Sequence, residues 1–375
     1  MSTTISVPGR VDEPADDPPA SVTAIVPTLA DERRRESLLR AIDSLRAAAR
    51  HARLTITAVV NGDRFDSGVL DSVLQRDVTI LQVPEPSLPG ALLAGRRSVT
   101  SDYFCFLDDD DEYLPSAIDR RIAALDRRPD CAMVTTNGYR RLAGADSMAL
   151  SQMDSIPSDP LSALFRENWL PSCAGLFRSA AIGVELFEEP HAYLEWTWLA
   201  YRIASRGLAI AVLDEPTFRI HDSASSLSKS GAYRSSHIAL YRRMLDTATR
   251  GDIRGSIRRR LASALSSESA ARLEENRLAE AWKLHCKALA CPGGWRRGSQ
   301  TLRLVAASIA RLAVPSSARR RLAASREVSR CRCARRHARH LSIIAIRRPR
   351  RCTSGALPVQ RATGAVRCAC GLPHR

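Results

Sequence analysis

The sequence predicts an α/β fold, in which a Rossmann-like, mostly parallel sheet is flanked by helices and followed by a helical C-terminal region. Three observations predict it. Strand-like and helix-like segments alternate from residue 21 to about residue 135, which is typical of βαβ units. The strand-like runs are almost continuously apolar, as strands buried on both faces are. Residues 236–324 are rich in Ala, Leu and Arg, with apolar residues at helical spacing.

The elements of the α/β part follow one another at short intervals. The first strand is predicted at Ser21–Thr28, and the next helix within 32–50, where four apolar residues share one face: Leu38, Leu39, Ile42 and Leu45. Further strands are predicted at 54–62, 78–84, 102–107 and 131–139, with a short helix at 90–99. A short helix and an extended piece are expected within 160–182, a helix at 192–207 that stops at Gly207, and a strand at 208–222 interrupted by Pro216.

These elements predict a layout of four segments. Residues 1–20 are rich in Pro and Asp and are therefore expected to be a disordered leader. They have no basic start followed by an apolar block, so a secretory signal is not expected. Residues 21–235 form the α/β domain, 236–324 the helical region, and 325–375 a tail. No apolar run approaches the roughly 20 residues that a membrane span needs, so a cytoplasmic location is expected.

The net charge of +16 belongs mainly to the tail. Residues 325–375 contain 13 Arg, no Lys and one acid, so this segment alone carries +12. Five of the ten cysteines also lie there, but their C-x-C pairs lack the spacing of a zinc ribbon. The tail is interpreted as disordered Arg-rich sequence, and the alternative is an RNA- or membrane-binding arm. No specific nucleic-acid partner is predicted.

The stretch "FCFLDDDDEYLP" (104–115) places four consecutive aspartates directly behind a buried strand. In open sheets of this type, ligands bind beyond the carboxyl ends of the strands, where Asn61 also falls. Side chains alternate in direction along an extended chain, so Asp108 and Asp110 are expected to point the same way. Carboxylate oxygens suit hard cations such as Mg²⁺ or Mn²⁺. Two interpretations stay open from these residues alone: a solvated turn, or a divalent cation site.

Four segments, taken in order, resemble the nucleotide-sugar glycosyltransferases of family 2, which have the GT-A fold. "SVTAIVPTLAD" is similar to the opening strand and turn of that family, and "AGRRSVTSDYFCFLDDDDEYLP" to its Gly-rich approach, strand and D-x-D motif. "YLEWTWLAYRIASRG" is similar to its acceptor-side helix, and "LDEPTFRIHDSASSLS" to its closing strand with an Arg-x-His. The resemblance covers residues 21 to about 230. It implies an inverting, metal-dependent hexosyltransferase that uses a nucleotide-diphosphate sugar, with a UDP-sugar as the first choice.

The resemblance also implies a role for each matching residue. Asp110 would be the principal ligand of Mn²⁺ or Mg²⁺, Asp108 would contact the metal or the ribose, and Asp111 the donor. His221 would close the site near the diphosphate as a further metal ligand. Glu195 would be the general base that takes a proton from the acceptor hydroxyl.

The nucleotide is expected beside the ends of the first two strands. The implied contacts are Pro27 and Thr28 on the first strand, and Asn61 and Asp63 at the end of the second. Purely local roles stay open for two residues: Asn61 precedes Gly62 in a turn dipeptide, and His221 has the alternative of a structural hydrogen bond.

The chain also departs from the family pattern. The usual Glu-Asp pair is Glu195-Trp196 here, the second strand ends in Asn61 where an Asp is usual, and Leu92-Leu93 replaces an Arg-Asn pair. The alternative function is therefore a catalytically silent relative that binds a sugar nucleotide or a partner. The acceptor is expected to be a glycan or a polyprenyl-linked sugar in polysaccharide or cell-envelope synthesis. Basic amphipathic helices in 236–324 predict either a helical cap or peripheral contact with the inner membrane face.

Overall fold

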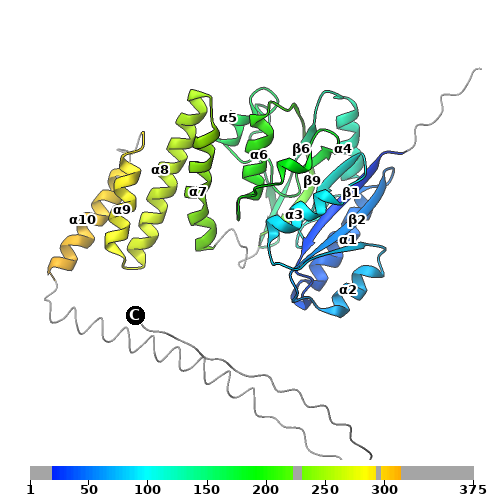
Figure 1. The fold of residues 1–375 in the computed structure, drawn as a ribbon, viewed down its shortest axis with the longest axis horizontal. Coiled ribbons are helices and arrows are strands. Elements are labelled where there is room, and N and C mark those ends of the chain that lie inside the picture. Colours follow the sequence, from blue (N-terminus) through cyan, green and yellow to red (C-terminus); the bar gives the residue numbers. More distant parts are fainter. Residues whose placement is uncertain (1–18, 223–229, 293–296, 314–375) are drawn as a thin grey trace, which may run out of the picture. The chain divides into compact units, whose positions relative to one another are not determined.

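The computed structural model of the chain describes residues 19–222, 230–292 and 297–313 (Figure 1). The predicted Arg-rich tail and all but two residues of the predicted leader lie outside this description, as does most of the Ser-rich loop after His221. Contacts divide the chain into a compact unit of residues 1–308 and a second unit that begins at Ile309, of which 309–313 are described.

Within the described residues, nine strands form one sheet in the order β3-β2-β1-β4-β8-β6-β9-β5, and β7 pairs with β6. The strands are β1 (Ser21–Thr28), β2 (Arg53–Asn61), β3 (Thr79–Val83), β4 (Tyr103–Phe106), β5 (Glu112–Tyr113), β6 (Met133–Leu142), β7 (Ala145–Met148), β8 (Gly175–Arg178) and β9 (Ile210–His221). β3, β2, β1 and β4 are parallel, and so are β6 and β9. β8 runs antiparallel between the two parallel groups.

The helices of the α/β part are α1 (Arg35–Ala48), α2 (Ser67–Leu74), α3 (Leu88–Arg97), α4 (Ala117–Asp126), α5 (Pro160–Leu164) and α6 (Glu195–Ser205). Two short 3₁₀ turns lie at Glu32–Arg34 and Val184–Leu186. As predicted, Gly207 ends α6 in a left-handed conformation, with φ of +69°. The predicted α/β class, with a sheet flanked by helices, is confirmed.

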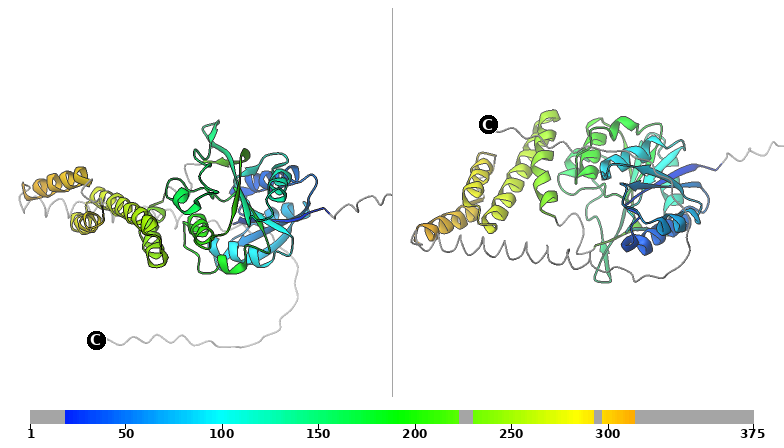
Figure 2. Two further views of the ribbon diagram at one scale, coloured as in Figure 1. Left: turned by 90° about the horizontal axis from the view of Figure 1, so that it is seen from above. Right: turned by 60° about the horizontal axis from the view of Figure 1, so that its bottom comes forward.

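Two cores lie on opposite faces of the sheet, because successive strand side chains point to opposite sides. On β4, Phe104 and Phe106 face the core shared with α3, α5 and α6, while Cys105 faces the core shared with α1, α2 and α4. Both groups of helices are visible in Figures 1 and 2. The Phe104 ring stacks on Phe177 at 4.9 Å, a contact worth about 0.5–1.5 kcal/mol beyond its buried area. β4 is therefore covered on both faces, which explains its continuous apolar run.

Gly138 on β6 is required by close packing. A methyl group at this position would lie 2.4 Å from two ring atoms of the fully buried Phe218. We expect Gly138→Ala to lower the free energy of unfolding by about 1–3 kcal/mol, because an overpacked core must shift side chains or backbone. Urea denaturation measures this. Gly251→Ala is the matched control, since a methyl group there meets no atom within 4 Å. Equal urea midpoints for the two variants would contradict the close contact between Gly138 and Phe218.

The C-terminal region is helical, as predicted, and consists of α7 (Gly231–Thr247), α8 (Gly251–Glu274), α9 (Leu278–Leu289) and α10 (Gly298–Ala313). Leu240 and Met244 of α7 and Ile253 of α8 belong to the same buried cluster as Phe104. Arg250, which precedes α8, donates two hydrogen bonds to the Asp159 carboxylate, at 2.9 and 2.7 Å. The first two C-terminal helices are therefore packed on the sheet core.

The last helices are joined by buried polar contacts. Ser269 donates to the carbonyl oxygen of Ala281 at 2.8 Å and accepts from Gln300 at 3.2 Å, which links α8 to α9 and α10. Leu304 of α10 is fully buried, whereas Leu302 and Val305 are 72% and 41% exposed. Of the helices in the described part of the chain, none combines the length and hydropathy required to cross a membrane.

Candidate active site

The four consecutive aspartates lie between β4 and β5, and the fold divides them into two pairs. Asp109 is 5% exposed and accepts hydrogen bonds from Thr28, at 2.7 Å, and from Arg34. Asp111 is 4% exposed and accepts the backbone N–H of His221 at 2.9 Å. These two carboxylates fasten the acidic loop to β1 and to β9. Asp108 and Asp110 alternate with them along the chain.

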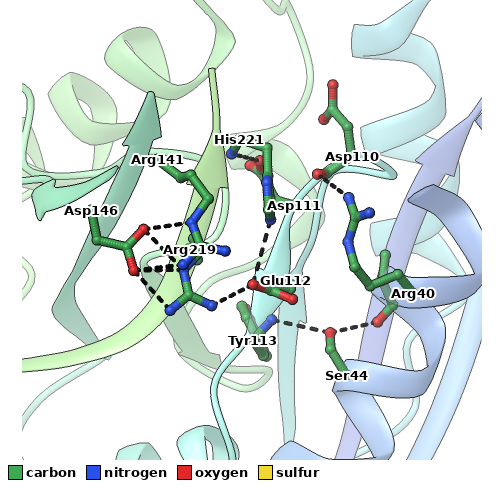
Figure 3. A network of polar contacts seen from close by, with 11 residues as sticks. Arg40, Ser44, Asp110, Asp111, Glu112, Tyr113, Arg141, Asp146, Arg219 and His221 are labelled. Carbon is green, nitrogen blue, oxygen red and sulfur yellow. Dashed lines mark hydrogen bonds and ion pairs between the residues drawn. The ribbon is translucent and has the colours of Figure 1, made fainter. Parts of the chain in front are cut away.

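Asp110 is the most accessible acid of the loop, and 40% of its side chain is exposed. Its carboxylate lies 3.3 Å from a guanidinium nitrogen of Arg34, which also binds Asp109. Arg40 of α1 donates to its backbone carbonyl at 3.1 Å, a contact drawn in Figure 3. Asp110 is therefore held by its backbone, and its carboxylate remains accessible for a ligand.

Asp108 lies in a region of concentrated negative charge. Burial raises its pKa to about 7, the carboxylates of Asp110, Asp109 and Glu195 add to the effect, and the Ser172 side chain opposes it. Burial, followed by the charge of Asp108, also raises the pKa of Asp111 well above its usual range. Neighbouring carboxylates repel one another, so they bind protons more readily than isolated ones do. For the same reason, a cation bound between them would be stabilised.

Glu195 is the first residue of α6, and its carboxylate accepts the backbone N–H of Tyr193 at 2.8 Å. It shares a small cavity of about 20 Å³ with apolar side chains: Pro89, Leu92, Leu186, Phe187, Pro190, Trp196, Trp198 and Leu199. Burial raises its pKa above the usual 4.5. The charge of Glu195 also acts on Asp108, so the helix start and the acidic loop belong to one site.

The two tryptophans beside Glu195 pack into the protein. The Trp196 ring meets Phe106 edge to face at 5.1 Å. Trp198 is 6% exposed, donates to the carbonyl of Glu189 at 3.1 Å and stacks on Tyr201 at 5.5 Å. Position 196, where the family pattern has an Asp, therefore holds an apolar ring against the sheet, and Glu195 is the nearby carboxylate.

His221 ends β9 beside the acidic loop. Its Nε2 is buried and lies 3.4 Å from Oε1 of Glu112 (Figure 3). The next loop, 223–229, is outside the described residues. The structure thus places Asp108, Asp110, Asp111 and His221 at the carboxyl ends of β4 and β9, and their roles in binding remain a prediction.

The ends of β1 and β2, where the nucleotide is expected, hold side chains that already form hydrogen bonds within the protein. Thr28 uses its hydroxyl to hold Asp109 and to accept the N–H of Ala30 at 2.9 Å, and Pro27 is buried in β1. Asn61 accepts the backbone N–H of Ser87 at 2.5 Å, which fixes the entry to α3. Asp63 is exposed. A local structural role is therefore observed for Thr28 and Asn61, and contact with a nucleotide remains a prediction.

The donor set fits a divalent cation that is shared with a substrate. Among the described residues, no three His, Cys, Asp or Glu side chains are arranged to hold a metal by themselves. Mg²⁺ is usually bound through one or two carboxylates together with substrate phosphates, and Asp108 and Asp110 supply carboxylates of this kind. An imidazole, as His221 has, also suits transition metals.

Several residues of the site were missed at the sequence level. Arg34, the last residue of the 3₁₀ turn Glu32–Arg34, and Arg40 of α1 contact the acidic loop. Burial raises the pKa of Asp111 and of Tyr233, and the charge of Arg140 on β6 opposes the rise in both. The run "ERRRESLLR" directly after the first strand was the available signal, since its helix begins at the edge where the aspartates lie.

Comparison with known proteins identifies the class. The model described as "Glycosyl transferase family 2" matches residues 23–179, a segment that contains β1 to β8 and the acidic loop. Residues 23–179 are therefore similar to glycosyl transferase family 2. This match and the observed sheet bear out the predicted resemblance and the GT-A fold. No curated protein sequence matches the chain.

Two solved structures illustrate the likeness. S. aureus TarS 1-349 in complex with UDP-GlcNAc has a TM-score of 0.47 and 12% identity, covering 66% of this chain and 72% of that chain. Glucosyl-3-phosphoglycerate synthase from Mycobacterium tuberculosis, in complex with Mn²⁺, UDP and glucosyl-3-phosphoglycerate, has a TM-score of 0.42 and 20% identity, covering 60% and 80%. Neither likeness is close enough to transfer a substrate to this chain.

Proposed function

We propose that this chain is an inverting, metal-dependent glycosyltransferase. It moves a sugar from a nucleotide-diphosphate sugar, with UDP as the expected nucleotide, to a hydroxyl of a glycan or a lipid-linked acceptor. The observation that carries the proposal is the division of the aspartates: Asp109 and Asp111 fasten the loop, whereas Asp110 keeps an accessible carboxylate beside Asp108. Catalysis is assigned to residues 21–235.

Asp110 and Asp108, with His221, would hold Mn²⁺ or Mg²⁺ against the donor diphosphate. The cation would neutralise the charge that develops on the departing diphosphate. Asp111 would support the donor side of the site, because it fixes the backbone of His221. Pro27 and Thr28 at the end of β1, and Asn61 and Asp63 at the end of β2, are proposed to border the nucleotide base.

Glu195 would act as the general base. Its carboxylate takes the proton of the acceptor hydroxyl while that oxygen attacks the anomeric carbon. The bond from this carbon to the diphosphate oxygen breaks in the same step, and the nucleoside diphosphate leaves with the electron pair. Because one displacement occurs on one face, the anomeric configuration inverts. The apolar cavity around Glu195 raises its pKa, which makes it a stronger base than an exposed Glu.

A second candidate function is a catalytically silent relative that binds a sugar nucleotide. It is favoured by one observation: Trp196 packs on Phe106, so the carboxylate usual at this position of the family pattern is replaced by an apolar ring. If Glu195 does not reach the acceptor, donor binding would remain without transfer.

The test is a thermal-shift screen of nucleotide sugars with and without Mn²⁺, followed by a transfer or hydrolysis assay with each stabilising donor. One donor whose stabilisation requires Mn²⁺, and which is turned over, supports the transferase. Stabilisation without turnover supports the silent relative. No stabilisation by any nucleotide sugar, with or without Mn²⁺, would refute both.

We further propose that the acceptor belongs to polysaccharide or cell-envelope synthesis and is presented at a membrane surface. Leu302 and Val305 lie on one side of α10, opposite the buried Leu304, and Arg303 flanks them without an acid in the helix. This is the arrangement of an interfacial helix.

The membrane proposal predicts that a charge on the exposed face of α10 weakens binding to anionic vesicles. Leu302→Asp is expected to weaken co-sedimentation with vesicles that contain phosphatidylglycerol by about tenfold or more, since burying a Leu contributes about 1.5–3 kcal/mol. Leu142→Asp, at another exposed leucine, is the control. Unchanged co-sedimentation of the Leu302 variant would contradict the proposal, as would an equal loss in the control.

A further inference from the structure

A chain of charged side chains leads from the β6–β7 hairpin to His221 (Figure 3). It runs through Asp146 of β7, Arg219 of β9 and Glu112 of β5, and so crosses the outer strands of the sheet. Glu112 and Arg219 face each other in the β5–β9 ladder, and Arg141 and Asp146 do so in the β6–β7 ladder. None of these four residues has been given a role in the site above.

Glu112 is the member that contacts His221. Its Oε1 accepts from Arg219 at 2.5 Å and lies 3.4 Å from Nε2 of His221. A guanidinium therefore sets the position of the Glu112 carboxylate, and the oxygen that it binds, Oε1, is also the one that faces the imidazole.

Arg219 is itself fixed from the other end. It donates three hydrogen bonds to Asp146, at 3.2, 3.1 and 2.9 Å, and Asp146 also receives two from Arg141, at 2.8 and 3.0 Å. The hydrogen bonds from Arg141 and then Arg219 lower the pKa of Asp146 to about 2. The charges of Arg141 and Arg219 match those of Asp146 and Glu112, so the four side chains form a neutral network of ion pairs.

Two consecutive acids lie against His221, one bound by a hydrogen bond and one near a buried Nε2 that has no hydrogen-bond partner of good geometry among the described residues. Its backbone N–H is bound by Asp111 and its Nε2 faces Glu112. The ring nitrogen that does not face Glu112 is Nδ1. Hydrogen bonds in active sites without substrate are often long and tighten when the ligand binds, which fits the 3.4 Å contact. A ligating histidine in other proteins is oriented in this way by a carboxylate on its second nitrogen.

We propose that Glu112 is a positioning residue for His221. It fixes the ring so that Nδ1 is presented to the cation and diphosphate, and Arg219 and Asp146 keep Glu112 in place. The inference rests on the proposed function for the part that concerns the cation. The contact between Glu112 and His221 is independent of that function and can be tested separately.

The first test measures Mn²⁺ affinity in the presence of UDP, by the electron paramagnetic resonance signal of the free ion. Glu112→Gln is expected to weaken Mn²⁺ binding by about 10–100-fold, as the loss of an outer-shell partner does in other metal sites. His221→Ala is expected to weaken it at least as much, and the double variant no further than His221→Ala. Glu215→Gln, at an exposed acid of β9 that pairs with Arg120, is the control and should bind as the unmodified protein does.

Two results overturn the proposal: an unchanged Mn²⁺ affinity in Glu112→Gln, or effects of Glu112→Gln and His221→Ala that add in the double variant. If the unmodified protein binds no Mn²⁺ with UDP, the proposed function fails instead. In that case the same four proteins are unfolded in urea. Non-additive shifts of the midpoint support the hold of Glu112 on His221, and additive shifts overturn it.

Discussion

Asp110→Ala is expected to lower kcat/KM by about 10²–10³-fold and to abolish Mn²⁺-dependent stabilisation by the donor, while the free energy of unfolding stays nearly unchanged. A bound cation supplies several kcal/mol of charge stabilisation to the departing diphosphate, and each 1.36 kcal/mol is tenfold in rate. The fold loses little, because the Asp110 carboxylate is 40% exposed and its closest charged neighbour is Arg34 at 3.3 Å. Steady-state kinetics and urea denaturation measure the two effects.

The neighbouring Asp109→Ala is the matched control, because it should show the opposite balance. Its loss leaves the Thr28 hydroxyl without its 2.7 Å acceptor and Arg34 without its closest carboxylate. Removing one partner of a buried hydrogen bond costs about 1–3 kcal/mol. A result in which Asp110→Ala unfolds the protein, or Asp109→Ala leaves its stability unchanged, would contradict the assignment of the two acids.

Glu195→Gln is expected to lower kcat by about 10²–10⁴-fold, the usual contribution of a general base, with little change in donor affinity. The amide can still accept the N–H of Tyr193, so α6 keeps its start. Kinetics with a donor identified in the screen, together with calorimetric titration of that donor, separate the two quantities. A parallel loss of donor affinity would show that Glu195 binds the donor.

The pH dependence follows from the environment of Glu195. Burial raises its pKa above 4.5. A base works in its deprotonated form, so kcat/KM should rise with pH through this raised pKa and level off above it, at a higher pH than an exposed Glu would give. In Glu195→Gln that rise should disappear. Glu188→Gln, at an exposed acid paired with Arg97, is the control and should keep it.

Much of the fold was predictable because the strands are buried on both faces. Apart from Asp102, the runs at 21–28 and 102–107 contain no charged residue, and the structure places β1 and β4 there. α2 was missed because it has only eight residues, one of them Gly68. β7 was missed because all four of its residues are exposed, so no apolar pattern marks it.

The candidate site was predictable in position but not in detail. That the acids follow a buried strand places them at the carboxyl edge of the sheet. Which acids anchor the loop by hydrogen bonds depends on contacts between residues far apart in the chain. Arg34 lies 75 residues from Asp109, and His221 lies 110 residues from Asp111. Such distant pairings leave no local pattern.

The division of the acidic loop into anchored and accessible carboxylates has a consequence for how this loop tolerates change in length. The N–H of Asp111 donates to the carbonyl of Asp108 at 3.1 Å, so the acids lie in a hydrogen-bonded turn whose length sets both anchors. Deleting one residue of the turn would separate Asp109 from Thr28 or Asp111 from His221, and would displace Asp110 as well. Point substitutions here should be survivable one at a time, whereas a one-residue indel should erase both the anchoring and the chemistry at once.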